Sequence, residues 1–190
     1  ITIPFPEAIK SKILEYKSNS NQDFVQIDIN YKEKLRQARI NNDGQRVDIN
    51  TLYDYKNEAI NNWVNNNYRG IFDMATGTGK TFTGIGAISR LFKDKKRLVT
   101  FICCPYTHLV DQWCEELQGF NINPVKCYGS TNYMDTLKRE VIKFKNKRTD
   151  FVCAVICNVS FKKDEIQELV KINLKDTLLL VDEAHNFGAL

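Results

Sequence analysis

The stretch that determines the fold is Gly70-Ile71-Phe72-Asp73-Met74-Ala75-Thr76-Gly77-Thr78-Gly79-Lys80-Thr81. It starts with a short apolar run, continues into a glycine-rich turn and leads into a helical pattern that begins at Lys80. The two glycines allow backbone angles at which successive N–H groups point toward one anion, and the start of a helix adds partial positive charge. The stretch therefore predicts a strand, a phosphate-binding loop and a helix. The alternative is a glycine turn with an exposed lysine.

The residues of this loop have expected tasks. The Lys80 ammonium can reach the β- and γ-phosphates of a nucleoside triphosphate, and the Thr81 hydroxyl can bind Mg²⁺. The strict form of the motif has a glycine six positions before the lysine, where this chain has Met74. The residues expected to surround the phosphates are Ala75, Thr76, Gly77, Thr78, Gly79, Lys80 and Thr81.

Short apolar runs alternate with amphipathic segments from about residue 51 onward. Near-continuous apolar runs are typical of parallel strands that helices cover on both faces. The sequence therefore predicts an α/β fold in three layers with a mostly parallel sheet, and ligands of such sheets bind at the carboxyl ends of the strands. Strands are expected at 70–74, 98–104, 124–128, 151–157 and 177–182, and helices at 53–66, 80–92, 107–117, 133–145 and 164–171.

A second signal follows the apolar run 177–181, where the chain reads Asp182-Glu183-Ala184-His185. Asp182 is placed to hold Mg²⁺ through water, and Glu183 to orient and deprotonate an attacking water. Two adjacent carboxylates beside an apolar strand repel each other unless a cation compensates. We therefore expect them to face Lys80, although a solvated strand end is the alternative. His185 is either a surface histidine or a residue that couples the site to a partner.

The composition is that of an ordinary globular protein. The 190 residues include 27 Lys+Arg and 23 Asp+Glu, for a formal net charge of +4, and 43% are hydrophobic. These values exclude a mostly disordered, collagen-like or disulfide-scaffold protein. No apolar run approaches the roughly 20 residues that cross a bilayer. The six cysteines lack metal-ligand spacing, so we expect buried thiols in a cytoplasmic protein without a membrane partner.

The first 50 residues differ from the rest. They are polar and lack a sustained hydrophobic period, so we expect 1–50 to be an N-terminal extension or linker and 51–190 to be the nucleotide-binding domain. The chain begins at Ile1, which suggests a piece of a longer protein.

At this point the residues resemble a known family. ATGTGKT at 75–81 and DEAH at 182–185 resemble motifs I and II of superfamily 2 helicases and translocases. Residues 52–60 are similar to the family's Leu-Arg-x-Tyr-Gln-x-Glu-Ala-Ile helix, and 105–113 to the Pro-x-x-x-Leu-x-x-Gln-Trp pattern of motif Ia. Residues 157–161 stand where the family often has Thr-x-x-Ser. The stretch 51–190 looks most like the helicase-like subunit of type I and type III restriction enzymes and related defence proteins.

The resemblance implies the first of two RecA-like P-loop domains, with ATP and Mg²⁺ in the cleft between them and double-stranded DNA across the top. The catalytic residues that it implies are Lys80, Asp182, Glu183 and His185, with Thr81 and Asp182 as metal ligands. It also implies a second RecA-like domain with an arginine finger, and it allows an attached nuclease. Because the chain stops shortly after motif II, we expect the 190-residue chain to be truncated, to bind nucleotide weakly and to hydrolyse it poorly.

The family reads adenine with a glutamine, and this chain has Lys56 at that position, beside Tyr55. A glutamine amide both donates and accepts hydrogen bonds, whereas a lysine only donates. With Lys56 at this position, the sequence leaves open whether the site prefers ATP to other nucleoside triphosphates, while Tyr55 can pack against the base.

Contacts with nucleic acid are expected where hydroxyl and N–H donors meet phosphates near helix starts. A helix N-cap is the alternative for Thr107. The residues expected to make these contacts are Thr107, His108, Gly129 and Ser130. Tyr106 is expected either to stack on a base or to pack in the core or at its boundary, and the resemblance implies that Ser160 faces the nucleic acid.

Taken together, these features predict an ATP-dependent DNA helicase or translocase motor domain of a restriction-type or defence-related protein. The alternatives are a DNA-repair or RNA helicase of the same superfamily and a scaffold that binds nucleotide and nucleic acid without turnover. A small-molecule P-loop kinase or a GTPase-like switch shares the loop but rarely has the acidic strand end.

Overall fold

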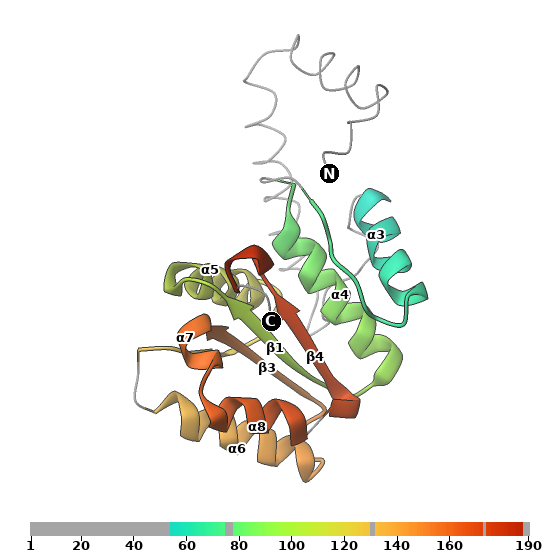
Figure 1. Cartoon of the computed structure of the whole chain (residues 1–190). Coiled ribbons are helices and arrows are strands. Elements are labelled where there is room, and N and C mark those ends of the chain that lie inside the picture. The colour runs from blue at the N-terminus through green and yellow to red at the C-terminus, as the bar shows by residue number, and fades with distance from the viewer. Residues whose placement is uncertain (1–53, 75–77, 130–131, 173, 188–190) are drawn as a thin grey trace. The chain divides into compact units, whose positions relative to one another are not determined.

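Four parallel strands form the sheet of the computed structural model, in the order β2–β3–β1–β4 (Figure 1). The structure describes residues 54–74, 78–129, 132–172 and 174–187. The strands are β1 (Leu98–Cys104), β2 (Val125–Cys127), β3 (Phe151–Cys157) and β4 (Thr177–Val181). The central strand β1 pairs with β3 from Leu98↔Phe151 to Cys104↔Cys157, and with β4 from Val99↔Thr177 to Cys103↔Val181. The carboxyl ends of these three strands therefore meet at one edge, which is where the acidic residues of the sequence follow β4.

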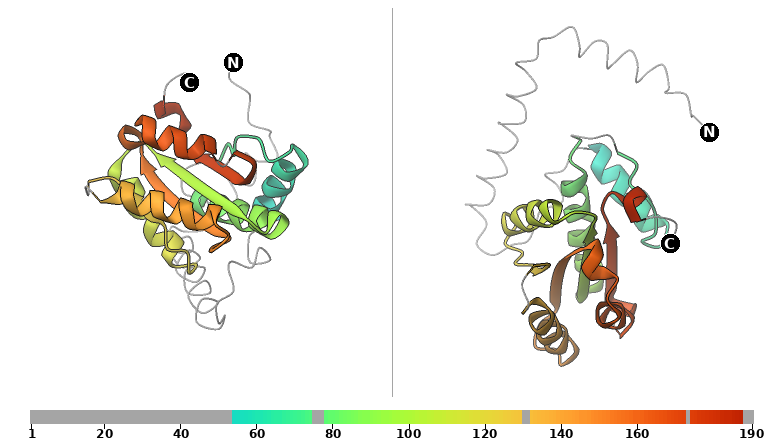
Figure 2. Two further views of the ribbon diagram at one scale, coloured as in Figure 1. Left: turned by 90° about the horizontal axis from the view of Figure 1, so that it is seen from below. Right: turned by 60° about the vertical axis from the view of Figure 1, so that its left-hand side comes forward.

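Helices cover both faces of the sheet (Figure 2). One face carries α3 (Asp54–Asn65), α4 (Lys80–Lys95) and α5 (Thr107–Gln118), and the other carries α6 (Tyr133–Lys145) and α8 (Asp164–Ile172). Short elements fill the connections: α7 (Asn158–Phe161) and the 3₁₀ turns η2 (Leu174–Asp176) and η3 (Ala184–Phe187). The predicted three-layer α/β domain with a parallel sheet is confirmed.

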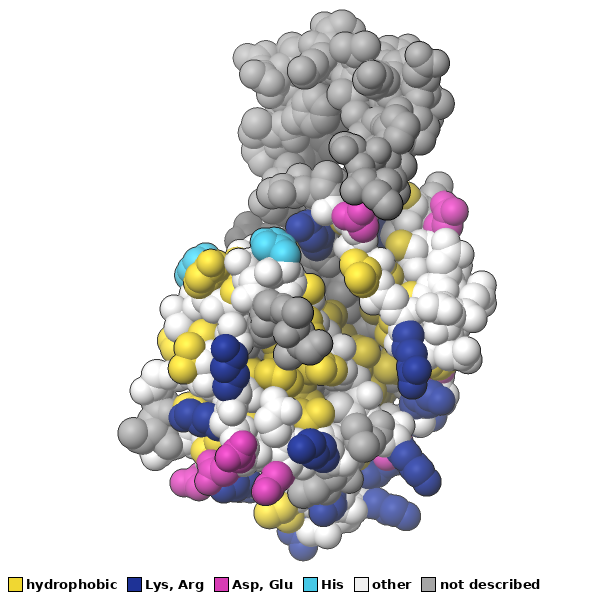
Figure 3. Space-filling model, viewed as in Figure 1, with side chains coloured by type: hydrophobic (Ala, Val, Ile, Leu, Met, Phe, Trp, Pro, Cys, Tyr) yellow, Lys and Arg dark blue, Asp and Glu magenta, His cyan; other side chains and the backbone are white. Residues whose placement is uncertain are grey.

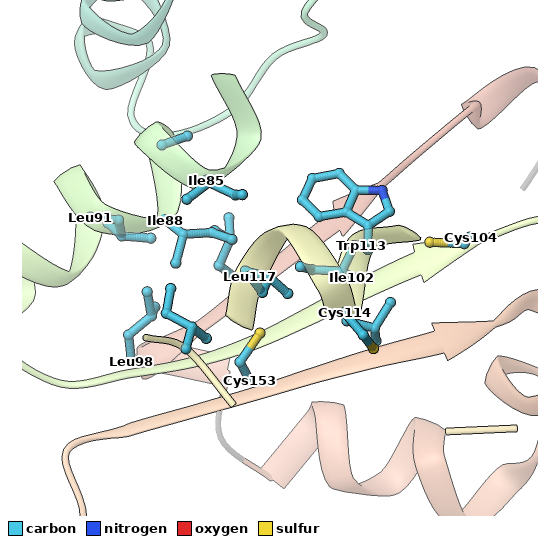
Figure 4. Close-up of a cluster of buried hydrophobic side chains, with 14 of the residues drawn as sticks. Ile85, Ile88, Leu91, Leu98, Ile102, Cys104, Trp113, Cys114, Leu117 and Cys153 are labelled. Carbon is cyan, nitrogen blue, oxygen red and sulfur yellow. The ribbon is translucent and has the colours of Figure 1, made fainter. Parts of the chain in front are cut away.

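Alternate residues of the central strands pack into two separate cores. In β1, Leu98 and Ile102 join the core beneath α3, α4 and α5, whereas Val99 and Phe101 join the core beneath α6 and α8. All seven residues of β1 are buried, which explains why its sequence is apolar apart from Thr100. Figure 4 shows the first of these cores, to which Ile85, Ile88 and Leu91 of α4 and Leu117 of α5 belong. Burial of each such side chain contributes about 1.5–3 kcal/mol, so these cores hold α4 and α5 against the sheet.

The predicted strand at 70–74 is wrong. These residues form no strand in the structure, and Ile71 is 89% exposed. The apolar side chain of Phe72 instead packs on Trp63 of α3, with the ring centroids 6.2 Å apart. An apolar run of this length has two ways to bury its side chains, and here contact with a helix replaces hydrogen bonding to a neighbouring strand.

The other predicted elements agree with the structure within a few residues at their ends. The strands at 98–104 and 151–157 and the helix at 133–145 match residue for residue, and the strand predicted at 124–128 is shorter, at Val125–Cys127. The predicted domain boundary at residue 50 lies outside the described residues and stays a prediction. Among the helices that the structure describes, none is both long and apolar enough to cross a bilayer.

Candidate functional site

The start of α4 lies directly after a glycine in a left-handed conformation. Gly79 has φ 84° and ψ 43°, and its carbonyl accepts the first bonds of the helix, from the Thr83 N–H at 3.1 Å and the Thr83 hydroxyl at 3.3 Å. Residues other than glycine rarely adopt this backbone conformation, so the turn into the helix depends on Gly79. The predicted loop residues Ala75, Thr76 and Gly77 lie outside the described part of the chain.

Lys80 and Glu183 form the centre of the site. The Lys80 Nζ donates to Glu183 Oε1 at 3.3 Å, and each side chain is about one third exposed, at 34% and 35%. The first turn of α4 is thereby joined to the residues that follow β4. The structure thus brings together the lysine of the glycine-rich motif and the acidic motif, as the sequence predicts. Thr81, half-buried, is the next residue of α4.

Glu183 itself has an unusual backbone. Its φ is 49°, in the left-handed region that costs a non-glycine residue about 1–2 kcal/mol. The neighbouring backbone holds this conformation from both sides: the Asp182 N–H donates to the Cys103 carbonyl at 2.9 Å, and the Asn186 N–H donates to the Glu183 carbonyl at 2.9 Å. The first of these bonds continues the pairing of β4 with β1 by one residue. The turn therefore points the Glu183 side chain back toward α4.

Asp182 is held by a different partner, Trp113 of α5. The indole Nε1–H donates to Asp182 Oδ2 at 2.8 Å. Trp113 follows the apolar residues Leu109 and Val110 on α5, and at 3% exposed it is buried. Nothing in the sequence signals the contact with Asp182, because the two residues are 69 positions apart.

His185 lies at the edge of the site. Its Nδ1 is 3.6 Å from Glu183 Oε2, and its Nε2 is 3.0 Å from the Asn186 amide. The side chain is 74% exposed, so a partner that docks on this edge can reach it.

The start of α3 contacts the glycine-rich loop through two residues. The Tyr55 hydroxyl donates to the Thr78 carbonyl at 2.9 Å. Lys56 is only 2% exposed, and its Nζ lies 5.7 Å from the Tyr55 ring and 5.6 Å from the Phe82 ring. Burial lowers the pKa of Lys56. A Cβ on Gly79 would lie only 2.6 Å from the Lys56 Nζ, so the ammonium is packed against the loop itself.

Of the residues expected to contact nucleic acid, three stand together at the start of α5. Tyr106, Thr107 and His108 are exposed, and the Tyr106 and His108 rings stack with their centroids 5.6 Å apart and their planes 7° apart. Thr107 is the first residue of α5 and Tyr106 is the cap position, so Thr107 does not serve as the N-cap. This pair presents flat aromatic faces at the same sheet edge as Asp182.

The other expected contacts are placed differently. Gly129 is exposed with φ 69°, and Ser130 lies outside the described residues. Ser160 is buried, at 7% exposed, and accepts a hydrogen bond of 3.3 Å from the Tyr133 hydroxyl, which in turn accepts one of 2.8 Å from Lys163. As the chain is folded here, Ser160 reaches no ligand without a rearrangement of α7.

The basic side chains Lys138, Arg139 and Lys143 of α6 are paired with acidic neighbours. Glu140 lies 2.8 Å from Lys143 and 3.7 Å from Arg139, and Glu165 lies 3.5 Å from Lys138. Figure 3 likewise shows Lys and Arg side chains interspersed with Asp and Glu over the lower part of the face in view. This surface therefore behaves as a mixed, solvated face.

The residues of the site fit a magnesium–triphosphate. Gly79 has no side chain where the Lys56 ammonium packs against the loop, Lys80 supplies a second cation, and Thr81 and Asp182 supply the hydroxyl and carboxylate oxygens that Mg²⁺ prefers. Within the described ranges, no cluster of three or more His, Cys, Asp or Glu forms a metal cage. A magnesium ion that is bound together with a triphosphate takes one or two protein oxygens, and phosphate oxygens and water complete its shell.

Comparison with known proteins gives the family of the chain. The family of the type III restriction enzyme res subunit matches residues 49–190, which is more than half of the chain. A comparison with curated proteins finds no match. The chain therefore belongs to the family of the type III restriction enzyme res subunit, and the predicted RecA-like, helicase-like character of its fold is confirmed.

Proposed function

We propose, from the membership of this chain in the family of the type III restriction enzyme res subunit, that it is the ATP-binding motor domain of a DNA translocase or helicase. The family implies a helicase-like ATPase that acts on DNA. The finer statements are proposals: ATP bound with Mg²⁺, hydrolysis coupled to movement on double-stranded DNA, and assembly with a second RecA-like domain and a nuclease in a restriction or defence protein.

The observation that carries the proposal is the pairing of Lys80 with Glu183 across the sheet edge at 3.3 Å. The pair holds a phosphate-binding cation and a candidate base within one site. When a triphosphate binds, Lys80 turns from Glu183 toward the β- and γ-phosphates, and the Glu183 carboxylate is released to accept a proton from water. Each of the two residues therefore keeps the other from its catalytic task until nucleotide arrives.

The remaining residues complete the site. Thr81 and Asp182 would hold Mg²⁺, whose positive charge would stabilise the negative charge that develops on the phosphates. Tyr55 and Lys56 stand on the side of the loop where the base or ribose would bind. His185, beside Glu183, is placed to connect the state of the site to a partner that docks on this edge.

DNA would contact the exposed start of α5. The N–H groups there, together with the Thr107 hydroxyl, are donors of the kind that bind phosphate oxygens, and the Tyr106–His108 stack offers aromatic surface. The six cysteines are free thiols and all buried, which supports a reducing, cytoplasmic location.

Isothermal titration calorimetry with Mg·ATP tests the nucleotide part of the proposal. We expect heat of association with this chain, and a Kd about tenfold or more higher for Lys80→Ala, because that change removes a charge-assisted hydrogen bond to phosphate. Lys143→Ala is the matched control, since Lys143 pairs with Glu140 on α6 and is not part of the site. Absence of heat, or equal loss in both variants, would contradict the proposal.

Fluorescence anisotropy with labelled double-stranded DNA and single-stranded RNA tests the substrate. We expect tighter binding to DNA, weakening as salt rises, and a weaker complex for Tyr106→Ala combined with His108→Ala. A preference for RNA would favour the RNA-helicase alternative. Binding of nucleic acid and nucleotide without ATP hydrolysis, even when the second RecA-like domain is present, would favour the scaffold.

A further inference from the structure

Trp113 contacts the acidic motif through a hydrogen bond that the sequence did not predict. Its indole N–H donates to Asp182 Oδ2 at 2.8 Å, while the ring is 3% exposed in the core between α4, α5 and the sheet. Figure 4 shows the indole at the margin of that core, with its nitrogen on the side of the ring away from Ile85. A buried ring that presents its one polar atom to a carboxylate has little freedom to release it.

The other side of the ring is closed by a glycine. A Cβ on Gly84 of α4 would lie 2.8 Å from the Trp113 Cη2 atom and 3.1 Å from the Leu180 Cδ1 atom of β4. Real Cβ atoms do not approach other carbon atoms so closely, so the indole occupies its place only because residue 84 lacks a side chain. The ring is thus held by the helix that begins with Lys80 and by the strand that ends before Asp182.

We infer that Trp113 is a positioning residue for the metal site: its N–H fixes Asp182 through Oδ2, so that Oδ1 is the oxygen presented to Mg²⁺ or to a water of the ion. This inference rests on the proposed function. A carboxylate at a strand end can rotate about its side-chain bonds, and a single donor on one oxygen removes most of that freedom. Partners that hold a metal ligand from behind are worth about 10–100-fold in metal affinity.

The position of Trp113 explains why a tryptophan is suited to this task. The ring must bury its apolar part against Gly84 and still carry a donor to the edge of the core, and an indole does both. A phenylalanine would fill much of the same space but would leave Asp182 Oδ2 without its donor.

The test compares ATP binding with and without the ion. The quantity measured is the ratio of the Kd for ATP in EDTA to the Kd for Mg·ATP, determined by calorimetry on this chain. For Trp113→Phe we expect this ratio to fall about tenfold while the Kd in EDTA stays the same, because the change affects only the metal-dependent part of binding. General damage to the fold would weaken both values together.

The chain contains two tryptophans, which provides a matched control. Trp63 is also buried, at 8% exposed, but packs on Tyr68 and Phe72, so Trp63→Phe also removes an indole but should leave the ratio unchanged. In this variant Trp113 is the single remaining indole. We expect its fluorescence to change when Mg²⁺ is added with ATP and not when ATP is added in EDTA.

A second variant reaches the same point without touching the indole. Gly84→Ala should push the ring away from Asp182 and lower the ratio as Trp113→Phe does, whereas Gly70→Ala, whose Cβ would be 3.7 Å from Trp63, should not. If the unsubstituted chain binds Mg·ATP and both Trp113→Phe and Gly84→Ala keep its ratio, the inference is overturned and the proposed function stands. If the unsubstituted chain binds no Mg·ATP, the proposed function fails and the inference fails with it.

Discussion

The ammonium of Lys80 lies 3.3 Å from Oε1 of Glu183, although the two residues are 103 positions apart in the chain. The pair is only partly buried, so its attraction contributes about 1 kcal/mol or less. An ion pair of that strength is easily exchanged for a phosphate. Without nucleotide, Lys80 and Glu183 therefore bind each other, and we expect nucleotide binding to separate them.

Glu183→Gln tests this exchange. The variant loses the ion pair and the candidate base together, so we expect hydrolysis, measured with the proposed second RecA-like domain present, to be abolished while Mg·ATP binds to this chain as tightly as before or up to about fivefold tighter. Calorimetry and phosphate release measure the two effects. Glu140→Gln, which breaks the pair with Lys143 on α6, should change neither. Weaker nucleotide binding by Glu183→Gln would contradict the exchange.

The backbone of Glu183 offers a separate test, on stability. Because its φ is 49°, glycine should fit this position better than alanine, and we expect the free energy of unfolding of Glu183→Gly to exceed that of Glu183→Ala by about 1 kcal/mol. Urea denaturation measures the difference. At Glu115, an exposed position within α5, the order should reverse, because glycine is about 1 kcal/mol worse than alanine inside a helix. If the alanine variant were more stable than the glycine variant at Glu183 as well, the backbone of Glu183 would not be strained.

Lys56→Gln tests how the base is read. A glutamine amide can both donate to and accept from the edge of adenine, so we expect the preference for ATP over GTP to rise about fivefold, the value of one net hydrogen bond of about 1 kcal/mol. Competition binding with the two nucleotides measures it. Lys95→Gln is the control, because Lys95 is exposed and also lies over an aromatic ring, 5.4 Å from that of Tyr68. Equal preference in wild type and Lys56→Gln would place the base elsewhere.

Lys56 also predicts a dependence of stability on pH. Burial lowers its pKa in the folded chain below the ordinary value of 10.5. Between the lowered pKa of the folded chain and 10.5, the unfolded chain therefore binds more protons at Lys56 than the folded chain does. The contribution of Lys56 to the free energy of unfolding thus rises as the pH rises through this range toward 10.5. Lys56→Gln should reduce that slope in urea titrations at several pH values, whereas Lys95→Gln should leave it as it is.

The buried thiols predict the opposite slope at high pH. Burial raises the pKa of Cys114 to about 11 and that of Cys127 to about 12, and it raises the pKa values of Cys103, Cys104 and Cys153 as well. Above about pH 9 the unfolded chain loses thiol protons that the folded chain keeps, so stability should fall by up to about 1.4 kcal/mol per pH unit for each thiol. Urea denaturation at pH 8, 9 and 10 checks this, and Cys114→Ala should make the fall less steep.

Local pattern was sufficient for most elements of the fold. The runs 98–104 and 151–157 are nearly all apolar, and most of their residues pack into one of the two cores, a pattern that the sequence displays directly. The segment 70–74 has the same apolar character but no strand pairing, because Phe72 is held by Trp63 of α3. Whether an apolar run pairs with a strand depends on neighbours that the run itself does not specify.

The candidate site divides in the same way. The motifs around Lys80 and Asp182 are readable from the sequence because the chemistry of a phosphate loop and a metal carboxylate requires particular residue types at short, fixed spacing. The burial of Ser160 under Tyr133 and the bond from Trp113 to Asp182 arise only when separate elements pack together. The sequence shows the spacing of residues within a motif directly. Contacts between side chains across a core instead depend on how helices and strands that are far apart in the sequence pack when they bury their apolar surfaces.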